Sequence, residues 1–180
     1  MECSKTIQII TLVTSKGNID IKLFGDKNPL TVSNFLENIK KGIYENKSFY
    51  KIINYPTTKI IQTGKFSNNE SLKNDNPYKL TSTQNIPLEI AFKESSEPLY
   101  NKQVIDPIKL KNLRPLLGKG YLAMVKVGEN ASSSTEFFFI LNRNSEFNGR
   151  YSIFGEVING FEILNKIEKK DKILKINLKN

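Results

Sequence analysis

The feature that most constrains the fold is the apolar run Thr135–Leu141, which follows a turn-rich stretch of Gly, Asn and Ser at 128–134. Successive side chains of a strand point to opposite faces, so the set that begins with Glu136 and the set that begins with Phe137 lie on opposite sides. Both sets are largely apolar, which predicts a strand buried on both faces. Glu136 is the exception, because a carboxylate on such a strand needs either solvent or a partner.

Other short runs have the same alternating character and are separated by turn residues. They are 6–13, 18–24, 49–53, 59–62, 86–92, 121–127, 151–158 and 173–178. Helical spacing of apolar residues is clearest after Asn28, the expected N-cap, with Pro29 at the first helical position and Gly42 past the end. A second, shorter helix is expected over 159–170. This pattern predicts an all-β-dominated fold, a closed eight-stranded antiparallel β-barrel capped by two α-helices.

The chain of 180 residues is long enough for one domain with a sizeable core, so 1–180 is interpreted as a single domain. Two polar or proline-interrupted stretches, at about 67–85 and 93–119, fit no element of a barrel. They are expected to be long surface loops, a kind of segment that is usually functional or mobile.

The absence of histidine excludes the Ser-His and Cys-His catalytic arrangements and nearly every usual zinc site. No cofactor is therefore expected. With a single cysteine there is no internal disulfide, and this does not distinguish one redox compartment from another.

The formal net charge is +9, carried by 27 basic residues of which only Arg114, Arg143 and Arg150 are arginine. This excess favours acidic partners, and a basic barrel for nucleic acid or an anionic membrane is one open hypothesis. However, lysine is spread along the whole chain and the arginine forks that read bases are scarce, so no specific nucleic-acid binding is expected.

No apolar run approaches the roughly 20 residues that a membrane-spanning helix needs, and the first residues are too polar to open a signal peptide. The chain as given is therefore expected to be soluble and cytoplasmic by default. It would be exported or lumenal if a precursor signal had been removed.

Lys51 and Gln62 are polar residues on otherwise apolar strand-like runs. One interpretation places both at an open strand edge with their heads in water, where lysine stems often pack against apolar surface. The other interpretation aims both into an apolar cleft.

Seven segments follow one another in a distinctive order, namely PLTVSNFLENIKKG (29–42), FYKII (49–53), QTG (62–64), LAM (122–124), TEFF (135–138), NGRY (148–151) and FGEV (154–157). Taken in this order, they resemble the motifs of the cyclophilin family of peptidyl-prolyl cis-trans isomerases over nearly the whole chain. The resemblance implies an isomerase that assists protein folding by binding proline-containing peptides or unfolded proteins, and that acts as a monomer.

The resemblance also implies roles for individual residues. Phe138 would form the floor of a proline pocket, and Ile60 and Met124 would line it. Gln62 would hydrogen-bond the substrate backbone, and Lys51 stands where the family has its catalytic arginine.

Two aromatic residues complete the implied pocket, since Phe147 would pack on the proline ring and Tyr151 stands where many members carry histidine. The family's usual glutamine is replaced by Glu136, its usual histidine by Tyr50, and Glu146 stands where many members carry tryptophan. These departures predict reduced activity and poor cyclosporin binding. An inactive module that still binds proline peptides is the alternative.

A compensating interpretation pairs Glu136 with Lys51 or Arg150. Such an ion pair would hold the cation of the site in place.

Overall fold

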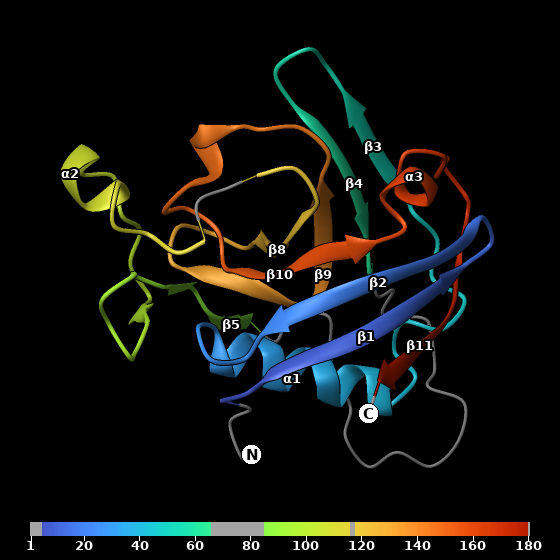
Figure 1. Cartoon of the computed structure of the whole chain (residues 1–180), viewed down its shortest axis with the longest axis horizontal. Helices are drawn as coiled ribbons and strands as arrows, with labels where there is room; N and C mark the ends of the chain where they lie inside the picture. Colours follow the sequence, from blue (N-terminus) through green and yellow to red (C-terminus); the bar gives the residue numbers. More distant parts are fainter. Residues whose placement is uncertain (1–4, 66–84, 116–117, 180) are drawn as a thin grey trace.

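The computed structural model describes residues 5–65, 85–115 and 118–179, and most of its strands form one large curled sheet (Figure 1). The elements in chain order are β1 (Ile7–Thr14), β2 (Gly17–Phe24), α1 (Pro29–Lys40), β3 (Lys51–Asn54), β4 (Lys59–Thr63), β5 (Asn85–Pro87), β6 (Glu89–Ile90), β7 (Leu99–Tyr100), α2 (Pro107–Leu110), β8 (Tyr121–Lys126), β9 (Ala131–Ile140), a 3₁₀ turn (Ser145–Phe147), β10 (Ile153–Asn159), α3 (Phe161–Leu164) and β11 (Ile173–Lys179).

The large sheet has the strand order β11-β1-β2-β10-β8-β9-β4-β3, with β5 added on β9 and every pair antiparallel. The predicted eight-stranded antiparallel sheet is thus confirmed, but "closed" overstates it, because no ladder joins the edge strands β3 and β11. Among the described residues the seam is crossed only between 46–49 and 170–173, by an isolated bridge between Ser48 and Lys172 and by several backbone hydrogen bonds, among them the one from Phe49 N to Asp171 O, 2.9 Å. The sheet is therefore a curled half-barrel.

The interior of this half-barrel is filled by aliphatic side chains of β1, β2 and β11 and by a group of aromatic rings. Phe35 of α1 lies at the centre of the rings, with its centroid 5.0 Å from Tyr44, 5.2 Å from Phe137 and 5.0 Å from Phe154. Such tilted and edge-to-face contacts add to the stability that burial alone gives. Helix α1 lies beside the half-barrel (Figure 1), and its buried face, which includes Val32 and Phe35, closes the core there.

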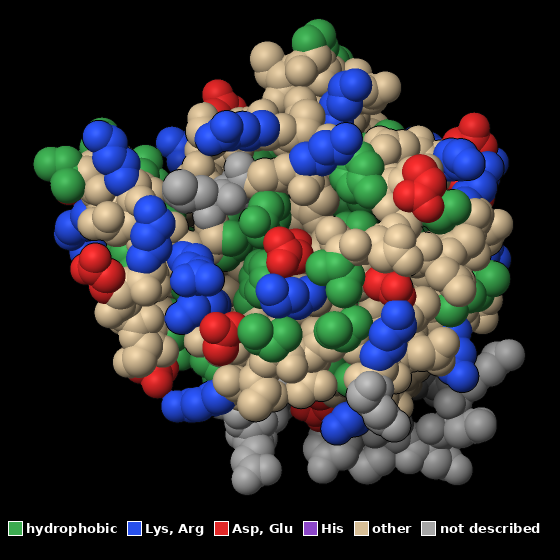
Figure 2. Space-filling model, viewed as in Figure 1, with side chains coloured by type: hydrophobic (Ala, Val, Ile, Leu, Met, Phe, Trp, Pro, Cys, Tyr) green, Lys and Arg blue, Asp and Glu red, His purple; other side chains and the backbone are tan. Residues whose placement is uncertain are grey.

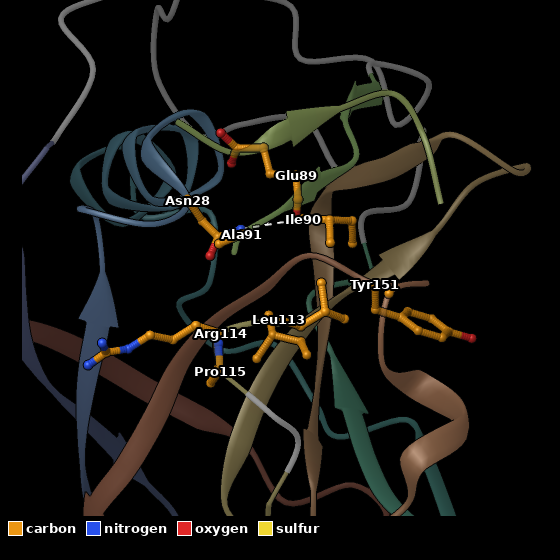
Figure 3. Close-up of a pocket in the computed structure, with 10 residues that line it drawn as sticks. Asn28, Glu89, Ile90, Ala91, Leu113, Arg114, Pro115 and Tyr151 are labelled. Carbon is orange, nitrogen blue, oxygen red and sulfur yellow. Dashed lines mark hydrogen bonds between the residues drawn. The ribbon is translucent and has the colours of Figure 1, made fainter. Parts of the chain in front are cut away.

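The start of α1 is capped by a residue far away in the sequence. Asn28 occupies the expected N-cap position, but its side chain makes no capping bond and instead donates to the carbonyl of Glu89, 3.1 Å (Figure 3). The Glu89 carboxylate accepts the N–H groups of Leu30 and Thr31 at 3.0 and 2.7 Å. Since the first N–H groups of a helix have no partner within the helix, this buried carboxylate completes α1.

Other elements differ from the predicted bounds. The expected helix over 159–170 is a single turn, α3, and the expected strand over 86–92 is two short strands that pair with different partners, β9 and β7. Strand β9 begins at Ala131, inside the expected loop 128–134. The stretch 93–119 contains β7 and α2, whereas the expected loop at 67–85 falls almost wholly outside the described residues.

The predicted alternation also fails at the start of β3. Alternation over 49–53 predicts that Phe49 and Lys51 share a face, but Phe49 is fully buried in the interior whereas Lys51 is exposed. The cause is that β3 begins only at Lys51: the N–H of Phe49 donates across the seam to Asp171 instead of joining a ladder.

Candidate active site

Four residues form a row across the outer, convex face of the sheet. Lys51 of β3 is paired with Gln62 of β4, Gln62 with Phe138 of β9, and Phe138 with Ala123 of β8. Directly paired residues of neighbouring strands share a face. Since strands lie about 4.8 Å apart, the backbones of Lys51 and Phe138 are separated by about 10 Å, and the Lys51 side chain is exposed at the end of the row.

Phe138 is the centre of an apolar group on this face, which we call the outer cluster. Its buried members are Ile60, Ala123, Phe138, Ile140 and Ile153, and the half-buried side chains packed on them include Ile53, Phe147 and Tyr151. The ring centroid of Phe138 is 5.7 Å from that of Phe147 and 5.4 Å from that of Tyr151. Only 3% of Phe138 is exposed, so the two covering rings form much of the accessible apolar surface.

Met124 is not part of this group. Its side chain belongs to the interior core and its strand partner is Phe137, which lies on the opposite face from Phe138. The prediction that Met124 lines the same pocket as Phe138 is therefore wrong. Ala123, one residue earlier, takes that place because the faces of β8 alternate.

A hydrogen-bonded group of three side chains lies beside the row. The Tyr50 hydroxyl donates to the Glu136 carboxylate, and the Gln62 amide nitrogen donates both to the Tyr50 oxygen and to Glu136, the latter at 3.2 Å. Burial raises the pKa of Tyr50, and the neighbouring Glu136 carboxylate raises it further. Tyr50 therefore keeps its proton at neutral pH and acts as the donor.

These bonds correct the expected ion pair of Glu136. Its carboxylate contacts the neutral groups of Tyr50 and Gln62, and among the described residues it forms no ion pair with Lys51 or Arg150. Tyr50 was noted in the sequence only as a replacement for histidine. The hydrogen bond between Tyr50 and Gln62 could not be inferred, because alternation over 49–53 places Tyr50 on the other face from Lys51.

A tight turn holds the two covering rings in place. Gly149 has φ of +71°, and a Cβ added there would lie 2.2 Å from the backbone oxygen of Val104, so only glycine fits. Just before the turn, Asn144 donates to the carbonyl of Thr57 at 3.2 Å and thereby ties the 3₁₀ turn to the loop between β3 and β4. Phe147 and Tyr151 flank this turn, and in Figure 3 the Tyr151 ring points away from the other labelled residues.

Metal-ligand clusters and membrane-spanning helices are both absent from the described residues. No group of three or more cysteine, aspartate and glutamate side chains in that part of the chain is placed to hold a metal ion. None of its helices has the length and apolar character required to cross a membrane.

The chain matches the family model described as cyclophilin type peptidyl-prolyl cis-trans isomerase/CLD over residues 9–178. It is 30% identical over 168 residues to peptidyl-prolyl cis-trans isomerase B of Escherichia coli, covering 89% of this chain and 84% of that protein. It is 28% identical over 158 residues to peptidyl-prolyl cis-trans isomerase CYP18-2 of Arabidopsis thaliana, covering 88% and 79%.

Among solved structures, the fold is similar to that of a cyclophilin type isomerase of Cryptosporidium parvum. The TM-score is 0.65 at 23% identity, with 97% of this chain and 99% of that chain covered. The same C. parvum protein, solved in the presence of the dipeptide Ala-Pro, gives a TM-score of 0.64.

Proposed function

The chain belongs to the cyclophilin-type peptidyl-prolyl cis-trans isomerase family, and on that premise we propose that its outer-face site isomerises X-Pro bonds at a reduced rate. The activity itself, cis-trans isomerisation of the peptide bond before proline, is that of the family. The observation that carries the proposal is the row in which Lys51, Gln62 and Phe138 are directly paired on one face.

The reaction needs little from the protein in the way of reactive groups. Amide resonance opposes rotation with a barrier of about 18–20 kcal/mol, and no bond is made or broken. An apolar surface for the proline ring and a cation near the imide nitrogen, which favours the twisted geometry, are sufficient. The outer cluster supplies the surface and Lys51 supplies the cation.

The proposed reduction in rate has a first cause in Lys51. An ammonium group keeps the positive charge of arginine but lacks the planar fork that can hold the substrate carbonyl and reach the imide nitrogen together. If the fork contributes as much as one preorganised donor does elsewhere, about 2.7–4 kcal/mol, its loss slows the chemical step by a factor of about 100 to 1,000.

The second cause lies in Gln62. Its amide nitrogen already donates to Tyr50 and Glu136, so the atom left for the substrate is the carbonyl oxygen. We propose that Gln62 accepts a hydrogen bond from a substrate N–H and does not donate one to a substrate carbonyl. Lys51 is then the donor that the row offers to the carbonyl.

Proline-containing peptides are the partners that fit this site, and a dipeptide of that kind accompanied the C. parvum relative. We propose unfolded proteins as the physiological clients, bound by a monomer and without specific recognition of nucleic acid. A second candidate function is a module that binds such peptides without accelerating exchange. The occupied donors of Gln62 favour it, because they bear on the reaction and leave the apolar surface unchanged.

Exchange NMR on a short X-Pro peptide tests the proposal, with Lys51→Ala, Lys51→Arg and the remote control Lys175→Ala, an exposed residue of β11. The expected result is slow but measurable exchange in wild type and loss of exchange in Lys51→Ala. In Lys51→Arg the exchange rate should rise by about 100-fold or more. Equal rates for wild type and Lys51→Ala would exclude catalysis by this row. Peptide binding with no exchange in either protein would establish the binding module.

A further inference from the structure

Residues 99–109, together with Phe92, line a cavity that shares no residue with the outer cluster. The cavity has a volume of about 460 Å³, within the range typical of ligand pockets. Its lining residues, which we call the insert groove, are Phe92, Leu99, Lys102, Gln103, Val104, Ile105, Asp106 and Lys109. At this edge of the molecule, around α2, Figure 2 shows lysine and arginine side chains beside hydrophobic ones.

Hydrogen bonds fix the walls of the insert groove. The Gln103 amide donates to the backbone oxygen of Glu129 at 2.8 Å, and the Val104 N–H donates to the backbone oxygen of Gly149 at 2.8 Å. Asp106 caps α2 by accepting the N–H of Ile108 at 2.8 Å. The groove is thus anchored to two separate loops of the half-barrel and is not a gap beside a free strand.

The chemistry of the insert groove combines apolar surface with positive charge. Ile105, which lines the groove, is 71% exposed, and Ile108 of the following helix α2 is 75% exposed, so apolar side chains reach the surface here. Lys102 and Lys109 form no ion pair within the described residues, and one Asp106 oxygen is engaged in capping. An apolar side chain flanked by carboxylates matches such a surface.

The insert groove is connected to the proline site. Val104 lines the groove and is bonded to Gly149, and Gly149 lies between Phe147 and Tyr151, whose rings cover Phe138. An extended peptide whose proline rests on the outer cluster would have to cross only this turn to reach the groove. Resting on the function proposed above, we propose that the insert groove is a second subsite that selects proline segments with a nearby apolar residue flanked by Asp or Glu.

The experiment compares a short X-Pro peptide with the same peptide lengthened, at either end, by a segment that carries one leucine between two glutamates. In two control peptides the glutamates are replaced by lysine or the leucine by serine. Dissociation constants come from NMR titration, and KM and kcat from exchange measurements. The expected result is a KM and a dissociation constant about tenfold lower for the Glu-Leu-Glu peptide, with kcat nearly unchanged, since one apolar side chain and two charges are added remote from the reacting bond.

The variant Lys102→Glu/Lys109→Glu should bring the ratio of affinities for the long and short peptides close to one. The charge-matched variant Lys166→Glu/Lys175→Glu changes exposed residues elsewhere and should leave that ratio at its wild-type value. Amide shifts at 102–105 that appear with the long peptide alone would place the segment in the groove.

Other outcomes are also decisive. Equal affinity for the long and short peptides, both isomerised, would overturn the second subsite and leave the isomerase proposal intact. Preference for the long peptide without isomerisation of either would support the groove and refute catalysis. Binding of phosphatidylglycerol vesicles that is lost in Lys102→Glu/Lys109→Glu, with no peptide preference, would overturn the peptide subsite in favour of a membrane contact.

Discussion

Two glutamates on otherwise apolar strands, Glu89 and Glu136, are stabilised in different ways. Glu89 is fully buried and both of its oxygens accept backbone N–H groups at the start of α1. Glu136 is half-buried and one of its oxygens accepts from two side chains, Tyr50 and Gln62. Backbone donors cannot turn away without the helix unwinding, whereas side chains can rotate or be replaced by water. The type of donor therefore decides whether a carboxylate supports the fold or orients a site.

The largest expected effect is on stability, in Glu89→Ala. The substitution leaves the N–H groups of Leu30 and Thr31 without partners, and at about 1–3 kcal/mol for each buried unpaired group the loss should be about 3 kcal/mol. The matched variant Glu136→Ala should lose under about 1 kcal/mol, because water can replace the carboxylate at a half-buried position. Urea unfolding of both variants measures the difference. Equal losses would contradict the distinction between the two glutamates.

A smaller effect, on activity, is expected for Glu136→Gln. A neutral amide accepts more weakly than a carboxylate, so one N–H of Gln62 becomes available to a substrate carbonyl. At about 0.5–1.5 kcal/mol for one hydrogen bond, kcat/KM should rise about twofold to twelvefold, while stability changes little. Exchange NMR measures the rate, and Glu45→Gln, an exposed glutamate after α1, is the control. A fall in kcat/KM would show that the carboxylate itself assists the reaction.

The smallest expected effect is a pH dependence of stability that belongs to Glu89. Burial raises the pKa of its carboxyl above the ordinary value, while the N–H groups of Thr31 and Leu30 oppose the shift. A folded-state pKa above the unfolded one means that the folded state holds the proton more tightly. The stabilisation of the folded state that comes from this shift is thus complete below the unfolded pKa of Glu89, about 4.3. It is lost as pH rises through the folded pKa.

Unfolding free energies measured from pH 4 upward test this for wild type and Glu89→Gln. The unfolding free energy of wild type minus that of Glu89→Gln should fall as pH rises through the two pKa values of Glu89, unfolded and folded, and should then level off. A difference that does not change with pH would mean that Glu89 titrates alike in the folded and unfolded chains.

Alternation along the sequence predicted the faces of β9 correctly. Phe137 belongs to the interior and Phe138 to the outer cluster, as the period of two requires. The same rule could not say which face of β8 is interior, because both of its faces are apolar, so it could not correct the place in the pocket that the resemblance implied for Met124. Alternation also failed at Phe49, whose backbone is hydrogen-bonded across the seam to residues 170 and 171 before β3 begins.

Partners across long stretches of sequence could not be predicted. Glu89 is separated from its helix donors by 58 and 59 positions, and Glu136 from Tyr50 by 86. Hydrophobic spacing indicates that a carboxylate on an apolar strand needs a partner, but it does not identify that partner. Segment 93–119 was predicted to be a long loop, and its apolar groove follows from the packing of β6, β7 and α2, which are too short to give a periodic signal.

The position of β1 in the sheet has a consequence for how the chain is made. β1 lies between β2 and β11, so one side of it is paired within the first 24 residues and the other only with residues 173–179. During synthesis on the ribosome, the side of β1 that pairs with β11 is an open strand edge until residues 173–179 have emerged. Unpaired edges of this kind pair with strands of other chains. A nascent chain therefore depends on rapid pairing of β11 with β1 to avoid aggregation with other nascent chains on the same polysome.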